Sequence, residues 1–181
     1  GAAKGYSVFM VTPDKDYGQL VDDSCVIYRQ KGDITEIVDR QAIAEKYGIA
    51  DPTLVRDILA LWGDSADNIP GVPGIGEKGA SKLVRQWGEV ENILANTAAI
   101  GGKTGKNIAE WGEKLLLAKR LTTICTDVPI EFVADNFKIS EPNYAELRGL
   151  YTGLNFSSVL RDLENVAIDE PASDGPHQEA Q

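Results

Sequence analysis

Four aspartates stand in two short pairs whose spacing could support metal chemistry. Asp14 and Asp16 follow the apolar run 6–11, and Asp64 and Asp67 lie about fifty residues later. In an extended backbone the first pair would point the same way, and in a helical backbone the second pair would share a side. Carboxylates without histidine or cysteine suit Mg²⁺ or Mn²⁺. The same residues could instead only cap turns, so both interpretations stay open.

A glycine-rich segment, IPGVPGIGEKGASKLV at residues 69–84, is the strongest local pattern. Glycines permit positive φ and leave backbone N–H groups open to a ligand. A helix starting near Gly76 would point its free N–H groups and positive dipole end at the same corner. Lys78, Lys82 and Arg85 add charge that attracts phosphate without reading bases. This helix-hairpin-helix spacing predicts binding to the DNA backbone, and a plain interhelical turn is the alternative.

The charge is unevenly distributed along the chain, so the total of −10 for 181 residues hides a basic middle. Residues 162–181 carry six acids and no Lys or Arg, and residues 1–70 have a net charge of −5. Residues 71–120, which include the glycine-rich segment, have a net charge of +3. The acidic total therefore does not exclude nucleic acid as a partner.

Other residue types exclude several classes of protein. No apolar run approaches the roughly 20 residues of a membrane helix, and no signal peptide opens the sequence. His177 is the only histidine, which argues against a histidine base or a zinc site. Cys25 and Cys125 lack CxxC spacing and are expected to be free thiols in a reducing cytoplasm.

The expected elements alternate between a small sheet and many helices. Residues 6–11 read as a strand buried on both faces of a parallel sheet, and residues 24–30 and 34–38 as two strands around a turn. From Asn165 the apolar content is too low to fold, which indicates a linker or tail. The expected helices are 39–47, 52–62, 77–87, 90–95, 104–108, 111–121, 143–153 and 157–163.

Three segments together resemble the 5′-nuclease (5′–3′ exonuclease, flap endonuclease) domain at the N-terminus of bacterial DNA polymerase I. They are VTPDKDYGQLV, LWGDSADNIPGVPGIGEKGASKLV and LTTICTDVPIEF, and the resemblance runs from Tyr6 to about Leu163. It implies an α/β class, mostly helical: the C-terminal part of a PIN-like, resolvase-like nuclease sheet followed by a helical subdomain. The implied divisions are 1–68 for a partial α/β core, 69–163 for the helix-hairpin-helix subdomain and C-terminal helices, and 164–181 for an acidic linker.

The resemblance also implies roles for particular residues. Asp14, Asp16, Asp64 and Asp67 would be catalytic ligands of two Mg²⁺ or Mn²⁺ ions that hydrolyse phosphodiesters. Backbone carbonyls near Val72 and Ile75 are expected to hold K⁺. The residues assigned to DNA contact are Lys15, Gly71, Gly74, Ile75, Gly76, Lys78, Lys82 and Arg85.

The family's further metal-binding carboxylates, its catalytic arginine and lysine, and its helical arch precede the strand that here begins at Tyr6. The chain is therefore expected to be a truncated piece that binds duplex, nicked or 5′-flap DNA but cleaves it poorly. Its place would be the bacterial cytoplasm, at the nucleoid, with the rest of the polymerase in cis, serving primer and flap removal in replication and repair. The open sheet edge is expected to allow self-association. A non-catalytic helix-hairpin-helix module is the alternative; a PIN-like RNase would not supply the hairpin.

Overall fold

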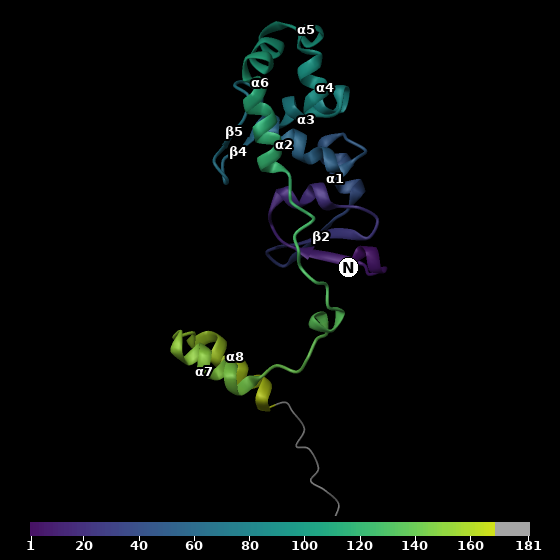
Figure 1. The fold of residues 1–181 in the computed structure, drawn as a ribbon. Coiled ribbons are helices and arrows are strands. Elements are labelled where there is room, and N and C mark those ends of the chain that lie inside the picture. The colour runs from purple at the N-terminus through teal and green to yellow at the C-terminus, as the bar shows by residue number, and fades with distance from the viewer. Residues whose placement is uncertain (169–181) are drawn as a thin grey trace, which may run out of the picture. The chain divides into compact units, whose positions relative to one another are not determined.

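The computed structural model describes residues 1–168, and these fall in two compact units (Figure 1). Unit 1 is Gly1–Phe132, and unit 2 begins at Val133. The predicted boundary between residues 68 and 69 lies inside unit 1. The division of the chain by function at that boundary therefore stays a prediction.

A three-stranded sheet lies at one end of unit 1, after a short 3₁₀ turn η1 at Ala2–Lys4 (Figure 1). Its order is β1 (Val8–Val11), β2 (Cys25–Lys31), β3 (Ile34–Val38). β1 pairs with β2 in parallel, and β2 with β3 antiparallel. The two predicted strands around a turn are thus confirmed.

The prediction that the first strand is buried on both faces is wrong. Burial alternates along β1, and Phe9 and Val11 are 55% and 78% exposed. The reason is that helices of the described chain cover only one face of this sheet, which contacts the core through Met10 and Ile27. A continuous apolar run cannot distinguish a strand covered on two faces from one covered on a single face.

Helix α2 (Val55–Trp62) forms the centre of the core of unit 1. Its residues Val55, Ile58, Leu59 and Leu61 have no exposed surface, because apolar positions occur on nearly every side. The segments before it are η2 (Lys15–Leu20), α1 (Arg40–Tyr47) and η3 (Pro52–Leu54).

Local capping fixes α1 as the sequence predicts. The Asp39 carboxylate accepts from the Ala42 N–H at 2.9 Å, and Gly48 ends the helix with φ of 70°. An acidic N-cap and a left-handed glycine satisfy backbone groups that the helix itself leaves unpaired. Both ends of the helix therefore lie where the sequence indicates.

Helices form the other end of unit 1. After the two-residue strands β4 (Gly63–Asp64) and β5 (Ile69–Pro70), four helices follow in succession. The predicted helices 104–108 and 111–121 are one element, α6, which is interrupted at Gly112, where φ is 25° and ψ is −104°. The four helices are α3 (Glu77–Trp87), α4 (Val90–Ala95), α5 (Thr97–Ile100) and α6 (Gly102–Thr122).

A partly buried charge network joins α2, α4 and α6, with Asp57 and Lys119 inside and Glu89 and Glu91 about half exposed. The Lys119 ammonium lies 2.9 Å from Asp57, 2.9 Å from Glu89 and 2.6 Å from Glu91. Asp57 is fully buried and also accepts from the Val90 N–H at 2.9 Å. Burial opposes the charged form of Lys119, but its three acidic partners outweigh this and raise its pKa to about 12.

Unit 2 consists of η4 (Ala134–Phe137), α7 (Tyr144–Gly153) and α8 (Ser157–Ile168). Because α8 runs to Ile168, residues 165–168 are helical, and the expectation that the chain does not fold from Asn165 is wrong there. That residues 164–181 act as a linker stays a prediction. The rest of that predicted linker, with His177, lies outside the described residues. Both cysteines are free thiols, as predicted. None of the helices described is long and apolar enough to cross a membrane.

Candidate metal centre and nucleic-acid interface

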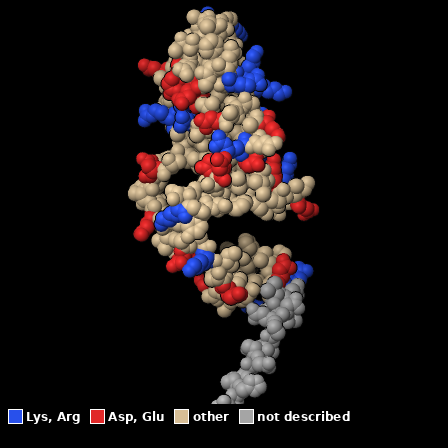
Figure 2. All heavy atoms as spheres, turned by 90° about the vertical axis from the view of Figure 1, so that its right-hand side faces the viewer, with Lys and Arg blue, Asp and Glu red and all other residues tan. Residues whose placement is uncertain are grey.

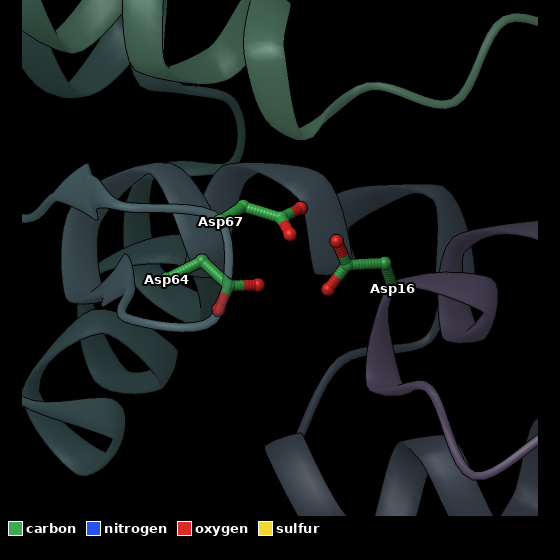
Figure 3. Close-up of side chains that lie close together, drawn as sticks. All are labelled: Asp16, Asp64 and Asp67. Carbon is green, nitrogen blue, oxygen red and sulfur yellow. The ribbon is translucent and has the colours of Figure 1, made fainter.

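Three of the four predicted aspartates come together. One carboxylate oxygen from each of Asp16, Asp64 and Asp67 lies within 4.8 Å of the others. Figure 3 shows the three side chains facing one another, Asp16 from η2 and the other two from the β4–β5 hairpin. The two segments are about fifty residues apart in sequence, so the tertiary fold makes this cluster, which we call the acid cluster.

The hairpin places Asp64 and Asp67 by a route that the sequence did not indicate. The backbone here is a hairpin and not a helix, since Gly63 pairs with Pro70 and Asp64 with Ile69 across a four-residue turn. The Asp64 carboxylate accepts from the Ala66 N–H at 3.0 Å, which fixes the start of that turn. The turn itself therefore directs both carboxylates to one side.

Asp14 takes a different position from its neighbour. β1 ends at Val11 and η2 begins at Lys15, so the extended backbone that would point Asp14 and Asp16 the same way does not continue to Asp16. The Asp14 side chain caps η2 by accepting from the Asp16 N–H at 3.0 Å. It lines a cavity of about 330 Å³ together with Asp64 and Asp67, but it is not in the acid cluster. The structure thus gives Asp14 the capping position and leaves it beside the candidate metal centre.

Lys15 points into the acid cluster. Its ammonium lies 2.6 Å from Asp64 Oδ2 and 3.6 Å from Asp16 Oδ1. Burial disfavours its charge, but the hydrogen bond to Asp64 and the neighbouring carboxylates outweigh this and raise its pKa. The resemblance assigned this residue to DNA contact, which stays a prediction, and in the structure its ammonium is the cation paired with the cluster. Its place between two aspartates was the available signal.

Asp16 is the electrostatically strained member of the cluster. Its Oδ1 atom is buried and has no hydrogen-bond partner. Burial, and then the charge of Asp14, raise its pKa from 3.8 to about 6 against the opposing effect of Lys15. An unpartnered buried oxygen that faces two further carboxylates fits a hard divalent cation bound through oxygen. The residues present therefore suit Mg²⁺ or Mn²⁺.

Asp64 is stabilised in its charged form. Although burial alone would raise its pKa, the hydrogen bonds from Lys15 and from the Ala66 N–H lower it below the usual value of 3.8. The two buried carboxylates of the cluster are thus shifted in opposite directions. At neutral pH both are ionised, and the cluster carries an excess of negative charge over Lys15.

The glycine-rich segment forms a tight corner against α2. A Cβ on Gly71 would overlap the Trp62 carbonyl oxygen, so only glycine fits there. The Val72 N–H donates to the Leu61 carbonyl at 2.9 Å, and Ile75 N–H to the Val72 carbonyl at 3.0 Å. Val72 and Ile75 bury their side chains, which leaves only their backbone for any contact with DNA or K⁺.

The open side of this corner is the start of α3. Gly74 has φ of 80°, and a Cβ on Gly76 would meet no atom within 4 Å. Gly76 is the N-cap of α3, whose first N–H groups have no partner within the helix. The corner therefore presents backbone donors and a positive dipole end to an anion.

The three predicted cations of α3 are not equivalent. Lys78 and Lys82 are exposed on its first two turns, and Lys82 lines a cavity of about 440 Å³ together with Gly74. The Arg85 side chain lies beside Gly48, about 13 Å along the helix from Gly76. The structure brings Lys78 and Lys82 to the corner but does not bring Arg85 there.

Charges of both signs are interspersed over unit 1. Figure 2 shows Lys and Arg side chains alternating with Asp and Glu on the face in view, with no broad basic face there. A polyanion such as DNA would therefore be attracted by a few individual Lys and Arg side chains and helix N-termini rather than by the electrostatic potential of a whole basic face.

Asn107 is a residue of this region that the sequence did not identify. From α6, its amide donates to the Pro73 carbonyl at 2.7 Å, and this bond ties the corner to a second helix. Nothing in its spacing signals this contact, since it joins residues 34 positions apart.

A cavity of about 540 Å³ connects the two features. It is lined by Lys15 and Asp64 at one side and by Asn68, Ile69, Pro70 and Gly71 at the other. An elongated ligand lying in it would contact the acid cluster and the first residues of the corner together.

Comparison with known proteins matches this arrangement to one family. A family model described as 5′–3′ exonuclease, C-terminal SAM fold, matches residues 50–145. DNA polymerase I of Bacillus caldotenax is 37% identical over 170 residues, which is 92% of this chain and 19% of that protein. Thermostable DNA polymerase I of Thermus thermophilus is 34% identical over 174 residues, 96% of this chain and 20% of that protein. The chain spans about a fifth of these curated relatives.

Solved structures show the same fold. A mutant of bacteriophage T5 5′-exonuclease superposes with a TM-score of 0.58 at 24% identity, covering 66% of this chain and 49% of that one. Bacteriophage T5 flap endonuclease, in a pseudo-enzyme–product complex with DNA and metal ions, gives 0.58 at 23% identity, over 66% of this chain and 44% of that one. The predicted class, a mostly helical α/β nuclease fold, is therefore confirmed.

Proposed function

Since this chain belongs to the 5′–3′ exonuclease family, we propose that it forms part of a metal-dependent nuclease that binds duplex DNA beside its cleavage point. The acid cluster is the candidate hydrolytic centre, and the corner formed by residues 71–76 before α3 is the candidate DNA-binding site. The observation that carries the proposal is the acid cluster itself, three carboxylates within 4.8 Å beside a glycine corner.

The chemistry follows from the residues of the cluster. Bound Mg²⁺ or Mn²⁺ would supply an activated water and stabilise charge on the leaving oxygen. Asp16, Asp64 and Asp67 would hold such ions, and Asp14 lines the same cavity within reach of bound water. Lys15, the cation already between the carboxylates, would limit their repulsion.

DNA would be held through its backbone rather than its bases. The N–H groups at the start of α3, with Lys78 and Lys82, would contact phosphates of one strand. Gly74 and Gly76 have no side chains there, which leaves room for those phosphates. K⁺ between the Val72 and Ile75 carbonyls and a phosphate would extend this grip, although the Val72 carbonyl also accepts from Ile75. Nicked and 5′-flap duplexes are the proposed substrates.

The related proteins support a larger setting. The polymerase relatives are about five times longer than this chain, so the remaining polymerase regions are proposed partners in cis, in a bacterial cytoplasm. The exposed residues of β1 leave a face on which another part of such a protein, or a second copy, would pack.

Cleavage by this chain alone should be weak. Two ions require a fuller set of ligands than the three clustered carboxylates and the neighbouring Asp14 supply. The alternative function, a DNA-binding module without catalysis, is favoured by one observation: Lys15 already neutralises Asp64 at 2.6 Å. Cation binding at the acid cluster separates the two functions.

The experiment measures DNA binding and cleavage on one substrate. A labelled 5′-flap duplex is titrated with the chain by fluorescence anisotropy in EDTA at several salt concentrations, and then incubated with Mg²⁺ or Mn²⁺. Lys78→Ala and Lys82→Ala should each weaken binding equally across sequences and reduce the salt slope by about one. Lys31→Ala, the same charge change at the exposed end of β2, is the matched control and should leave both unchanged.

The cleavage arm uses Asp67→Asn as its control. Weak cleavage that Asp67→Asn abolishes supports the proposal. The absence of cleavage also supports it, provided that the chain still binds both the duplex and Mn²⁺. Unchanged duplex affinity in both lysine variants would move the DNA site elsewhere. Duplex binding without any Mn²⁺ binding at the acid cluster would instead establish the non-catalytic module.

A further inference from the structure

Gln19 lies three residues after Asp16 in η2, and its side chain bonds to backbone groups rather than to the carboxylates of the acid cluster. Its side chain is buried, with 7% of its surface exposed. Its amide nitrogen donates to the Asp16 carbonyl at 3.0 Å and to the Thr122 carbonyl at 2.8 Å. Its amide oxygen accepts from the Ile124 N–H at 3.0 Å. Both N–H donors and the acceptor oxygen are therefore used.

These bonds connect the segment of Asp16 to the far end of α6. Thr122 is the last residue of that helix, and terminal carbonyls of a helix have no partner within it. The Thr122 hydroxyl lies 3.0 Å from the Arg56 carbonyl, which places the same point against α2, and 3.1 and 3.2 Å from the carbonyls of Ala118 and Lys119 within its own helix. Since α2 leads directly into β4, the supports of Asp16 and of Asp64 meet at the end of α6.

Asp16 depends on its backbone for its placement. Its Oδ1 atom has no hydrogen bond, and its nearest cation, Lys15, is 3.6 Å away. The cap from Asp14 holds its N–H, and Gln19 holds its carbonyl. Because Oδ1 has no hydrogen bond of its own, these two backbone contacts on either side of the residue help to set where the carboxylate points.

We propose that Gln19 is a positioning residue: it fixes the Asp16 carboxylate toward Asp64 and Asp67 and makes that geometry depend on the docked end of α6. The role rests on the proposed metal centre. Groups that orient metal ligands from behind commonly change metal affinity when they are removed. Gln19 would do so through a backbone carbonyl.

The test compares two variants that each remove buried hydrogen-bonding groups at this point. Gln19→Met keeps the side-chain length but loses all three bonds. Thr122→Val removes the hydroxyl that faces the carbonyls of Arg56, Ala118 and Lys119 and leaves the three bonds of Gln19 intact, so it controls for lost stability. Mn²⁺ affinity of the full chain is measured by calorimetry or by electron paramagnetic resonance, with thermal unfolding recorded for each variant and Asp67→Asn as the site control.

Gln19→Met should weaken Mn²⁺ binding about tenfold, and Thr122→Val should stay within about twofold of the wild type. A purely structural role would lower the melting temperature of both variants and leave both Mn²⁺ affinities alike. Gln19→Met with wild-type Mn²⁺ affinity, while Asp67→Asn loses binding, would overturn the positioning role.

A crystal structure of metal-free Gln19→Met gives a readout that does not depend on the metal centre. The Asp16 carboxylate should leave the cluster, where one oxygen from each of the three carboxylates now lies within 4.8 Å of the others. If Asp67→Asn binds Mn²⁺ like the wild type, the proposed metal centre is wrong, and this structure still decides whether Gln19 places Asp16. An unmoved Asp16 would overturn the inference.

Discussion

Asp16→Asn should stabilise the metal-free protein at neutral pH. The Asp16 side chain is 13% exposed, and its pKa is raised from 3.8 to about 6. Asp16 is therefore mostly ionised at neutral pH, although the folded state disfavours the ionised form. A rise of that size corresponds to about 3 kcal/mol against the ionised form. Because an asparagine amide must also find partners in the cluster, we expect a gain of about 1–3 kcal/mol.

The pH dependence gives this prediction its sign. A carboxyl with a raised pKa in the folded state carries no penalty below 3.8, an increasing penalty between 3.8 and about 6, and the full penalty above that. The variant should therefore be more stable than the wild type at pH 7.5, and the difference should vanish near pH 4. Thermal unfolding in EDTA measures it, and at roughly 3 °C per kcal/mol the melting temperature of unit 1 should rise by about 3–9 °C.

A control and a metal titration complete the test. Asp23→Asn makes the same charge change at a side chain that is 91% exposed, and it should alter stability by less than about 0.5 kcal/mol. Adding Mn²⁺ should stabilise the wild type more than Asp16→Asn and so reduce the difference between them. An Asp16→Asn protein no more stable than the wild type at pH 7.5 would refute the proposed electrostatic strain.

Three further changes test other parts of the structure. Lys119→Met should lower the unfolding free energy of unit 1 by about 3–5 kcal/mol in urea, because it removes the cation 2.9 Å from the fully buried Asp57 and leaves only Arg56, at 3.5 Å. Lys106→Met loses only an exposed pair and should cost under about 0.5 kcal/mol, and equal midpoints would contradict this. Gly71→Ala should abolish duplex binding in the anisotropy assay, since its Cβ overlaps a backbone carbonyl of α2 and must displace the corner; wild-type affinity would show that the corner is not the DNA site. Lys15→Met should tighten Mn²⁺ binding about fivefold at pH 8, because the ammonium 2.6 Å from Asp64 competes for the same oxygens; weaker binding would mean that Lys15 holds the carboxylates in place.

The sequence alone determined the features that depend on neighbouring residues. The Asp39 cap and the Gly48 stop of α1, the strands on either side of Gly32, and the glycine corner before α3 lie where the pattern predicts. Each follows from backbone preferences of a few adjacent residues. The resemblance to the nuclease family rested on the same short segments.

Only the tertiary structure decided which side chains meet. Asp14 and Asp16 differ by two positions, yet one caps η2 and the other enters the acid cluster, because the chain turns into a 3₁₀ helix after β1. Lys15 and Gln19 lie in the same short segment, and their partners Asp64 and Thr122 are 49 and 103 residues away. A side chain's direction follows from its backbone angles, but what it contacts depends on the packing of distant elements. That packing determines the candidate site.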